Sequence, residues 1–177
     1  MAEDCKLAER AQQGDRDAFR QLLERHYDTA YRVAYRFLRH SEDAEDVAQD
    51  ICLALPAKLG SFEARSRFST WFYRVVVNAC RDHLRKRRST EALQSSYAMF
   101  RDIDGADCVD DAERLDWLNQ ALAALEPALR ETAILVLSED LSHAETARAL
   151  GCAEGTVSWR MAEVRKRLKA LAESSDD

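Results

Sequence analysis

Residues 141–171 read LSHAETARALGCAEGTVSWRMAEVRKRLKAL, and this stretch decides the fold of the carboxyl-terminal part of the chain. Ala147, Gly151 and Val157 have the spacing of two crossing helices. A small residue lets the helices approach, glycine makes the turn, and an apolar residue locks the second helix onto the first. The pattern predicts a helix-turn-helix, with a helical hairpin that packs only on its own domain as the alternative.

Local signals around this motif indicate where its helices begin and end. Ser142 and Glu145 form a capping-box pattern before a helix at 144–150. Pro127 suits the first turn of an earlier helix that reaches about Leu137. The residues expected in the core of this region recur at helical spacing: Leu115, Leu118, Ala121, Leu122, Leu125, Val157, Met161, Val164, Leu168 and Leu171.

Three longer helices are predicted upstream, because apolar residues recur there every three or four positions. They cover residues 15–40, residues 41 to about 60 with Ser41 as the cap, and residues 68–88. The second of these helices is expected to stop between Pro56 and Gly60. In the third, the expected core residues are Phe68, Phe72, Val75, Val76, Ala79 and His83.

The composition favours an all-α chain of two small helical domains. The 177 residues include only five Gly and two Pro, too few for the many turns of a sandwich or barrel. Residues 89–112 lose the helical period and collect Ser and Asp, which is typical of a flexible linker. We therefore predict a domain at 1–90, an acidic flexible linker at 91–112, and a second domain at 113–177 that holds the helix-turn-helix.

Charge is distributed unevenly along the chain. The formal net charge is −6, yet residues 1–90 hold 17 basic against 14 acidic side chains, while residues 91–115 hold two against seven. Any contact with an anionic partner is therefore expected to be local and patch-like. No apolar run approaches the roughly 20 residues that span a bilayer, so we expect a cytoplasmic protein without membrane insertion.

Two helices of the first domain carry a second, polar face. In the helix after Ser41, acidic residues flank a leucine, which suits docking on a basic helical partner: Asp46, Gln49, Asp50 and Leu53. In the next helix and the loop before it, interleaved aromatic and cationic groups suit an unstacked single strand: Phe62, Arg65, Arg67, Trp71, Arg74, Asn78, Asp82 and Arg85. The alternative for both is a solvated face, in the second case with one aromatic residue tucked under the loop.

The last helix presents polar and cationic residues opposite its apolar stripe. Cations suit phosphates, and shorter polar groups suit base edges in a major groove. The residues assigned to this DNA contact are Thr156, Ser158, Trp159, Arg160, Glu163, Arg165 and Arg167. Partial burial of Trp159 against a neighbouring element or a partner protein is the alternative for that residue.

No pattern in the sequence points to enzyme chemistry. The five cysteines are dispersed and never form a CxxC pair, so reduced thiols are expected. Cys80 and His83 lie three apart, but no second pair lies near them in sequence, so a core thiol beside a partly buried histidine is the favoured interpretation. We expect no catalytic residue, no metal and no cofactor.

Four segments in this order resemble the successive blocks of one bacterial family, the sigma factors of the extracytoplasmic-function group. The segments are DAFRQLLERHYDTAYRVAYRFL (17–38), DAEDVAQDICLAL (43–55), FSTWFYRVVVNACRDHLRKRR (68–88) and LSHAETARALGCAEGTVSWRMAEVRKRL (141–168). The resemblance implies a dissociable initiation factor that binds core RNA polymerase, directs it to specific promoters and assists promoter melting.

The same resemblance implies a partner for each face. It places the clamp of the polymerase beta-prime subunit on Asp46, Gln49 and Asp50, and the minus-ten promoter element on the face that includes Trp71 and Asn78. It places the minus-thirty-five element on the helix-turn-helix, and it also implies contact with the beta flap and an anti-sigma factor as a further partner.

The sequence also departs from the family's usual residues at Ser158, Trp159 and Glu163, so different minus-thirty-five contacts are expected. Two rival hypotheses stay open at this point. One is a stand-alone helix-turn-helix repressor that binds a palindromic operator as a dimer. The other is an interaction protein that mimics a sigma factor in order to sequester its inhibitor.

Overall fold

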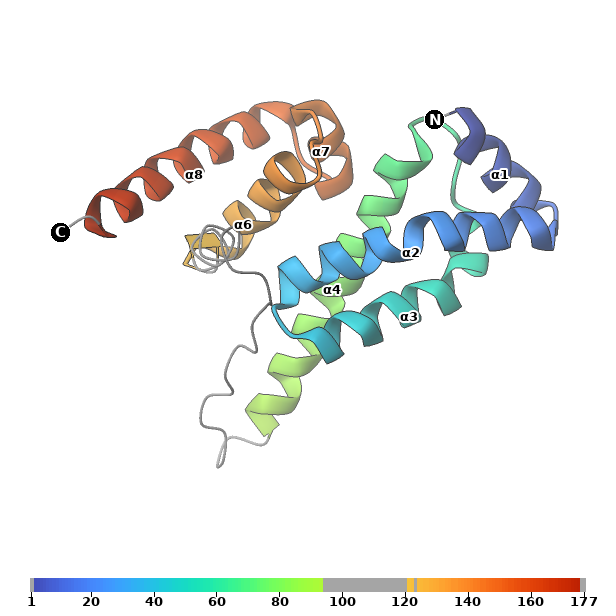
Figure 1. Cartoon of the computed structure of the whole chain (residues 1–177), viewed down its shortest axis with the longest axis horizontal. Coiled ribbons are helices and arrows are strands. Elements are labelled where there is room, and N and C mark those ends of the chain that lie inside the picture. Colours follow the sequence, from blue (N-terminus) through green and yellow to red (C-terminus); the bar gives the residue numbers. More distant parts are fainter. Residues whose placement is uncertain (1, 94–120, 123, 176–177) are drawn as a thin grey trace, which may run out of the picture. The chain divides into compact units, whose positions relative to one another are not determined.

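The computed structural model describes residues 2–93, 121–122 and 124–175. Every regular element in these ranges is a helix, which confirms the all-α prediction, and none of these helices combines the length and apolar composition needed to cross a bilayer. The chain divides into two compact units, Met1–Ile103 and Asp104–Asp177 (Figure 1). From position 94 onward the predicted linker at 91–112 lies outside the described residues, as do Leu115 and Leu118.

Helix α2 (Arg16–Leu38) is the central element of the first unit and packs against α1, α3 and α4. Asp15 caps its start, because one carboxylate oxygen accepts the backbone N–H groups of Asp17 and Ala18, each at 3.0 Å. The helix ends at Leu38, and Arg39 caps it in a left-handed backbone conformation with φ of 57°. Both ends agree with the prediction from the sequence.

Helix α3 (Ser41–Leu59) shows one departure from the prediction. Its cap is His40, which has an extended backbone and whose ring Nδ1 accepts the backbone N–H of Asp43 at 3.3 Å. Ser41 is therefore the first helical residue and not the cap. The helix ends at Leu59, within the predicted range, and Pro56 lies inside it.

Helix α4 (Phe68–Leu93) is longer than predicted. The sequence predicts loss of the helical period at residue 89, but the helix continues to Leu93 and so enters the predicted linker. Ala79 is only partly buried, because the core side of the helix runs through Val77 and Cys80 instead. Among the α4 side chains that the structure describes, the buried ones are Phe68, Thr70, Phe72, Val75, Val76, Val77 and Cys80.

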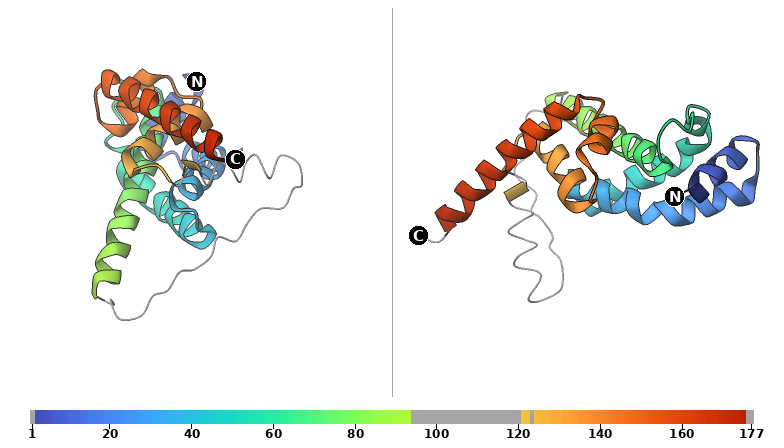
Figure 2. Two further views of the ribbon diagram at one scale, coloured as in Figure 1. Left: turned by 90° about the vertical axis from the view of Figure 1, so that its left-hand side faces the viewer. Right: turned by 90° about the horizontal axis from the view of Figure 1, so that it is seen from above.

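Helix α1 (Ala2–Gln12) is absent from the sequence prediction. It packs against α2 with Leu7 in the core, and Arg25 of α2 holds its start through ion pairs to Glu3 at 3.0 Å and Asp4 at 2.9 Å. The views agree that α1 lies at the end of the first unit opposite the carboxyl end of α4 (Figures 1 and 2). Helix α1 therefore completes the bundle at the end where α3 finishes and α4 begins.

The described helices of the second unit are α6 (Pro127–Ala133), the π-helical turn η1 (Ile134–Ser138), α7 (His143–Leu150) and α8 (Glu154–Ser175). Pro127 occupies the first turn of α6, as predicted. Arg130 of α6 fastens the residues before the helix, donating from Nε to the Leu122 carbonyl at 3.0 Å and from Nη2 to the Leu125 carbonyl at 3.3 Å.

Helices α7 and α8 form the predicted helix-turn-helix. Ser142 and Glu145 make a complete capping box, and Gly151 ends α7 with φ of 69° and ψ of 38°, a conformation that favours glycine. The core of the crossing consists of Ala147, Val157 and Met161, with Val136 and Cys152 partly buried against it. Ala147, Gly151 and Val157 therefore serve as the small residue at the crossing, the turn residue and the locking apolar residue, as their spacing predicts.

Candidate functional site

Helix α3 carries four residues on the side opposite its core stripe, here called the acidic face: Asp46, Gln49, Asp50 and Leu53. All four are exposed, and Leu53 is 81% exposed. The Gln49 amide donates to the Glu45 carboxylate at 3.3 Å, on the same surface. None of the four residues contributes to the core, so the acidic face is available to a basic partner.

Phe62, which the sequence analysis places among the DNA contacts, is only 5% exposed. Its ring meets Phe68 edge-on and also contacts Trp71, with ring centroids 5.5 Å apart in each case. A buried phenyl ring stabilises the fold by about 2 kcal/mol, so Phe62 anchors the loop from inside. This corrects its assignment as a DNA contact, because a ring enclosed in the core cannot stack on a base.

Trp71 occupies the boundary between this aromatic core and solvent. Its ring contacts Phe62 and Phe68, again with centroids 5.5 Å apart, and the side chain is half-buried. The alternative interpretation, in which one aromatic residue is tucked under the loop, therefore applies to only part of the surface of Trp71. An indole that is held in place and still partly exposed suits stacking on a base, because binding has to restrict its motion only a little further.

The α4 face consists of Trp71 and four exposed residues that follow it along the helix: Arg74, Asn78, Asp82 and Arg85. Arg85 pairs with Asp82 at 3.0 Å, and in the preceding loop Arg65 pairs with Glu63 at 2.7 Å. Arg67 of that loop is exposed as well. Exposed ion pairs contribute little and exchange readily, so these guanidinium groups can still meet phosphates.

A polar cluster that the sequence analysis missed joins the start of α3 to the second half of α4. One carboxylate oxygen of Asp43 lies 3.4 Å from His83 Nε2, and the other lies 3.3 Å from Arg87 Nη1. Asp43 and these partners are about 40 residues apart in sequence, so only the packed bundle brings them together. The cluster anchors the helix that carries the α4 face.

No disulfide bond joins the cysteines of the described segments, and their surroundings are structural. Cys80 is fully buried, which confirms its interpretation as a core thiol, and His83 faces Asp43. Burial raises the pKa of the Cys52 thiol, which therefore stays protonated at neutral pH. Within the part of the chain that the structure describes, no group of three side chains could hold a metal ion.

Helix α8 presents what we call the recognition face: Thr156, Ser158, Trp159, Arg160, Glu163, Arg165 and Arg167. Trp159 is 65% exposed, so it is not buried within its own unit. The exposed Ser158 hydroxyl lies 3.0 Å from Nδ1 of His143, at the start of α7. The recognition face therefore draws on both helices of the motif.

The charged residues of the recognition face differ in how they are held. Arg167 donates to Glu163 at 3.1 Å and pairs with Glu126 at 3.4 Å, and these carboxylates raise its pKa. Arg160 lies 3.5 Å from the hydroxyl of the buried Thr132. Arg165 is exposed, whereas Arg160, Glu163 and Arg167 are partly covered, so the first is the most accessible to phosphate.

Comparison with known proteins assigns a family to both units. Residues 22–90 match sigma-70 region 2, and residues 115–168 match sigma-70 region 4. The chain is 38% identical over 170 residues to the ECF RNA polymerase sigma factor SigM of Mycobacterium tuberculosis, covering 95% of this chain and 84% of that protein. It is 29% identical to the ECF RNA polymerase sigma factor SigW of Bacillus subtilis, covering 93% and 94%.

Solved structures agree with these matches. CnrH, solved in complex with the cytosolic domain of CnrY, is similar with a TM-score of 0.75 and 27% identity, covering 97% of this chain and 98% of that one. The sigma factor RpoE of Bartonella quintana, solved with the anti-sigma factor NepR, is similar with a TM-score of 0.72 and 28% identity, covering 88% and 96%.

Two sigma-70 regions in this order, each on its own helical unit, define a transcription initiation factor of the sigma-70 type. The chain belongs to the extracytoplasmic-function (ECF) group of RNA polymerase sigma factors. It is an alternative sigma factor, which directs RNA polymerase to promoters, so its partners are core RNA polymerase and promoter DNA.

Proposed function

We propose that this sigma factor divides its work among the three surfaces described above. The acidic face docks on the clamp of the beta-prime subunit, and the α4 face with the loop at 60–67 holds the unstacked minus-ten strand. The recognition face of α8 reads the minus-thirty-five element. The domain limits at 1–90 and 113–177, and a contact of the second domain with the beta flap, belong to the same proposal.

The observation that carries this proposal is the contrast between two faces of the first unit. Helices α3 and α4 pack together, yet α3 exposes carboxylates around Leu53 while α4 exposes guanidinium groups around a half-buried indole. Carboxylates repel phosphates and attract a basic protein surface, whereas cations and aromatic rings attract nucleic acid. One small bundle is thereby equipped to bind a protein and a single strand at the same time.

Strand opening by this arrangement requires no covalent chemistry, and we propose that the chain is not an enzyme. Extrusion of a base costs a few kcal/mol of unstacking. Stacking on an aromatic side chain returns about 1–3 kcal/mol per base. Trp71 supplies that stacking surface, and Arg74 and Arg85 supply cations for the phosphates. A net charge of −6 makes the free protein a weak ligand for duplex DNA, so polymerase has to hold it over the promoter.

For the minus-thirty-five element we propose that Arg160 and Arg165 position the helix on the phosphate backbone, while Ser158 and Trp159 face the bases. An exposed indole offers apolar contact to a thymine methyl group. Glu163 can accept from the amino group of cytosine, provided that it releases Arg167.

An anti-sigma factor and a cytoplasmic location complete the proposal. The sigma factor RpoE was solved with the anti-sigma factor NepR, and CnrH was solved with the cytosolic domain of CnrY; both are similar in fold to this chain. We extend this mode of control to the present protein. Bacterial RNA polymerase and its promoters lie in the cytoplasm, which is where a promoter-specificity subunit has to act.

Run-off transcription with purified core polymerase tests the function as a whole. The purified chain, free of any inhibitor, is added to core enzyme on a library of upstream regions. We expect a distinct subset of promoters to become active only when the chain is present. Initiation that is the same with and without the chain across the library contradicts the proposal, and so does tight, specific DNA binding by the chain without polymerase.

The docking surface is tested with Asp46→Arg combined with Asp50→Arg. Reversing two carboxylates that face a basic surface is expected to weaken binding to core polymerase about a hundredfold, with helicity unchanged. The matched control is Glu24→Arg with Asp28→Arg, which reverses two exposed carboxylates at the same spacing on α2. Affinity measured by co-purification and fluorescence anisotropy should fall for the first pair only, and equal losses in both pairs would remove the acidic face as the docking site.

A further inference from the structure

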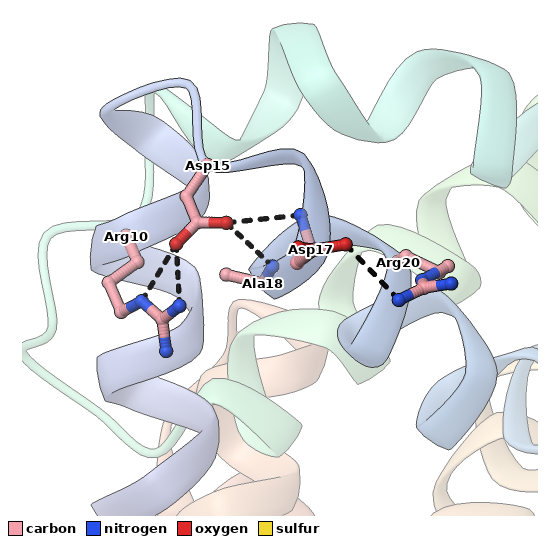
Figure 3. A network of polar contacts seen from close by, with 5 residues as sticks. All are labelled: Arg10, Asp15, Asp17, Ala18 and Arg20. Carbon is pink, nitrogen blue, oxygen red and sulfur yellow. Dashed lines mark hydrogen bonds and ion pairs between the residues drawn. The ribbon is translucent and has the colours of Figure 1, made fainter.

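The connection between α1 and α2 is held rigidly by Asp15. One carboxylate oxygen caps α2 through Asp17 and Ala18, and the other accepts two hydrogen bonds from Arg10 of α1, from Nε at 2.9 Å and from Nη2 at 2.6 Å (Figure 3). The backbone hydrogen bond from Ala18, followed by the bond from Arg10, lowers the pKa of Asp15. Gly14 makes the turn with φ of 91°. The last residue of α1 therefore has a fixed position.

That last residue, Gln12, reaches across to the far end of α3. Its side-chain Nε2 donates to the carbonyl of Leu59 at 2.6 Å and to the carbonyl of Phe62 at 2.8 Å. A primary amide has two N–H donors, and both are used here. The two acceptors are 47 and 50 residues away in sequence, one at the end of α3 and the other inside the loop at 60–67.

The loop at 60–67 is secured at Phe62 and projects beyond it. The Phe62 ring is buried, its N–H donates to the Leu59 carbonyl at 2.9 Å, and its own carbonyl accepts from Gln12. After this anchor, Ala64 adopts a left-handed φ of 53°, and the exposed Arg65 and Arg67 lead into α4. The orientation of the Phe62 carbonyl thus sets the direction in which the cationic end of the loop leaves the core.

We propose that Gln12 is a positioning residue for capture of the unstacked strand. Through two hydrogen bonds it orders the loop at 60–67 before DNA arrives, so that Arg65, Arg67 and Trp71 form one surface. Preorganisation of this kind lowers the cost of binding, because fewer groups have to be ordered in the complex. The inference rests on the proposed function, and it gives α1, which lies outside the matched range 22–90, a part in promoter opening.

The test compares Gln12→Met, Gln12→Lys and Gln13→Met. Methionine keeps the length of the side chain but cannot donate, whereas lysine keeps N–H donors for the two carbonyls. The exposed neighbour Gln13 provides a matched control for the same substitution. Each variant is measured in three ways: hydrogen exchange of the loop amides in the free protein, affinity for core polymerase, and permanganate-detected opening of an active promoter.

For Gln12→Met we expect loop exchange to rise and promoter opening to fall, each about 25-fold and at unchanged polymerase affinity, since two hydrogen bonds are lost and each is worth a factor of about five. Gln12→Lys should restore both loop exchange and promoter opening to wild-type values, and Gln13→Met should alter neither of them. Normal opening in Gln12→Met, or a failure of Gln12→Lys to restore opening once loop exchange is restored, would overturn the inference. If the wild-type protein opens no promoter with core polymerase, the proposed function itself is wrong and the positioning role is wrong with it.

Discussion

The two proposed DNA surfaces are built on different principles, and their tryptophans show the difference. Trp71 on α4 is half-buried and packs against Phe62 and Phe68, so the α4 face is continuous with the core of its unit. Trp159 on α8 is 65% exposed, and the core of the helix-turn-helix lies on the other side of that helix. Substitutions in the α4 face should therefore affect both function and stability, whereas substitutions in the recognition face should affect function with little change in stability.

The largest expected effect of this contrast is at Phe68. It is 1% exposed, and its ring lies within 6 Å of His26, Phe62, Trp71 and Phe72. Phe68→Ala should lower the free energy of unfolding by about 3–5 kcal/mol, because a large cavity opens at the centre of the aromatic cluster. Urea denaturation followed by circular dichroism measures the loss.

The control for this prediction is Phe68→Leu, which keeps most of the apolar volume and should cost less than about 1.5 kcal/mol. If Phe68→Ala costs no more than Phe68→Leu, the aromatic cluster does not support the α4 face in the way described.

Parallel substitution of the two tryptophans tests the contrast directly. Trp71→Ala should cost about 2 kcal/mol of stability, roughly half the loss at a fully buried aromatic residue, and should also reduce permanganate-detected opening of the minus-ten region. Trp159→Ala should change stability by less than about 0.5 kcal/mol, as at other surface positions. It should nevertheless weaken use of promoters with a minus-thirty-five element by about 1–3 kcal/mol.

These two variants are compared by urea denaturation and by transcription on matched promoters. A stability loss at Trp159 as large as that at Trp71 would mean that the recognition face is also part of a core. Unchanged opening with Trp71→Ala, also in combination with Asn78→Ala, would move the single-strand site away from the α4 face.

Substitution of helix caps should have a smaller effect on stability. The comparison separates a cap that the local sequence predicts correctly from one that the tertiary structure replaces. Ser142 closes a complete capping box, so Ser142→Ala should cost about 1 kcal/mol. Ser41, which has the sequence signal of a cap, lies inside α3 behind His40, so Ser41→Ala should change stability by less than about 0.5 kcal/mol. Thermal denaturation of both variants makes the comparison, and a larger loss at Ser41 than at Ser142 would contradict the assignment of His40 as the cap.

The smallest expected effect is a pH dependence in the first unit. His26 lies between Phe68 and Phe72, and burial lowers its pKa below the ordinary 6.5, while Asp4 opposes this shift in part. Its Nε2 is 3.6 Å from Asp4, too far for a hydrogen bond, and has no hydrogen-bond partner among the described residues. His26 therefore takes up a proton at a higher pH in the unfolded chain than in the folded one. Its neutral, buried form contributes to the free energy of unfolding in full above about pH 6.5, and this stabilisation is lost as the pH falls.

The measurement is the urea-derived free energy of unfolding at pH 7.5 and 5.5, a window that avoids the titration of the carboxylates. The wild-type protein should be less stable at the lower pH, and His26→Phe should remove most of the difference. A wild-type protein that becomes more stable at pH 5.5 would show that the attraction of Asp4 outweighs burial.

Much of the helical architecture could be predicted because its signals are local. The 3.6-residue periodicity located α2, α3 and α4, and the pairs Ser142–Glu145 and Ala147–Gly151 located the helix-turn-helix. The exposure of Asp46, Asp50 and Leu53 also followed from helical periodicity, since residues opposite a buried stripe point outward. These features depend on residues three or four positions apart, which the sequence displays directly.

The features that could not be predicted depend on residues that are distant in the chain. Helix α1 carries few large apolar residues, so its periodicity is weak, and Arg25 and Gln12 supply contacts that only the packed bundle forms. Phe62 looked like a base-stacking residue because an aromatic ring in a polar loop has no periodicity that would mark it as buried. His40 is the cap of α3 in place of Ser41 because of the backbone conformation between α2 and α3, where Arg39 is left-handed and His40 is extended.

By itself, the sequence determined the helical character, the two regions and the residues that face outward, because hydrogen bonding and amphipathic periodicity act within one or two turns. Only the tertiary structure decided which aromatic residues are buried, how α1 reaches the loop at 60–67, and how Asp43 anchors α4. Contacts across 40 to 50 residues leave no periodic trace in the sequence, since their geometry exists only after the helices have packed.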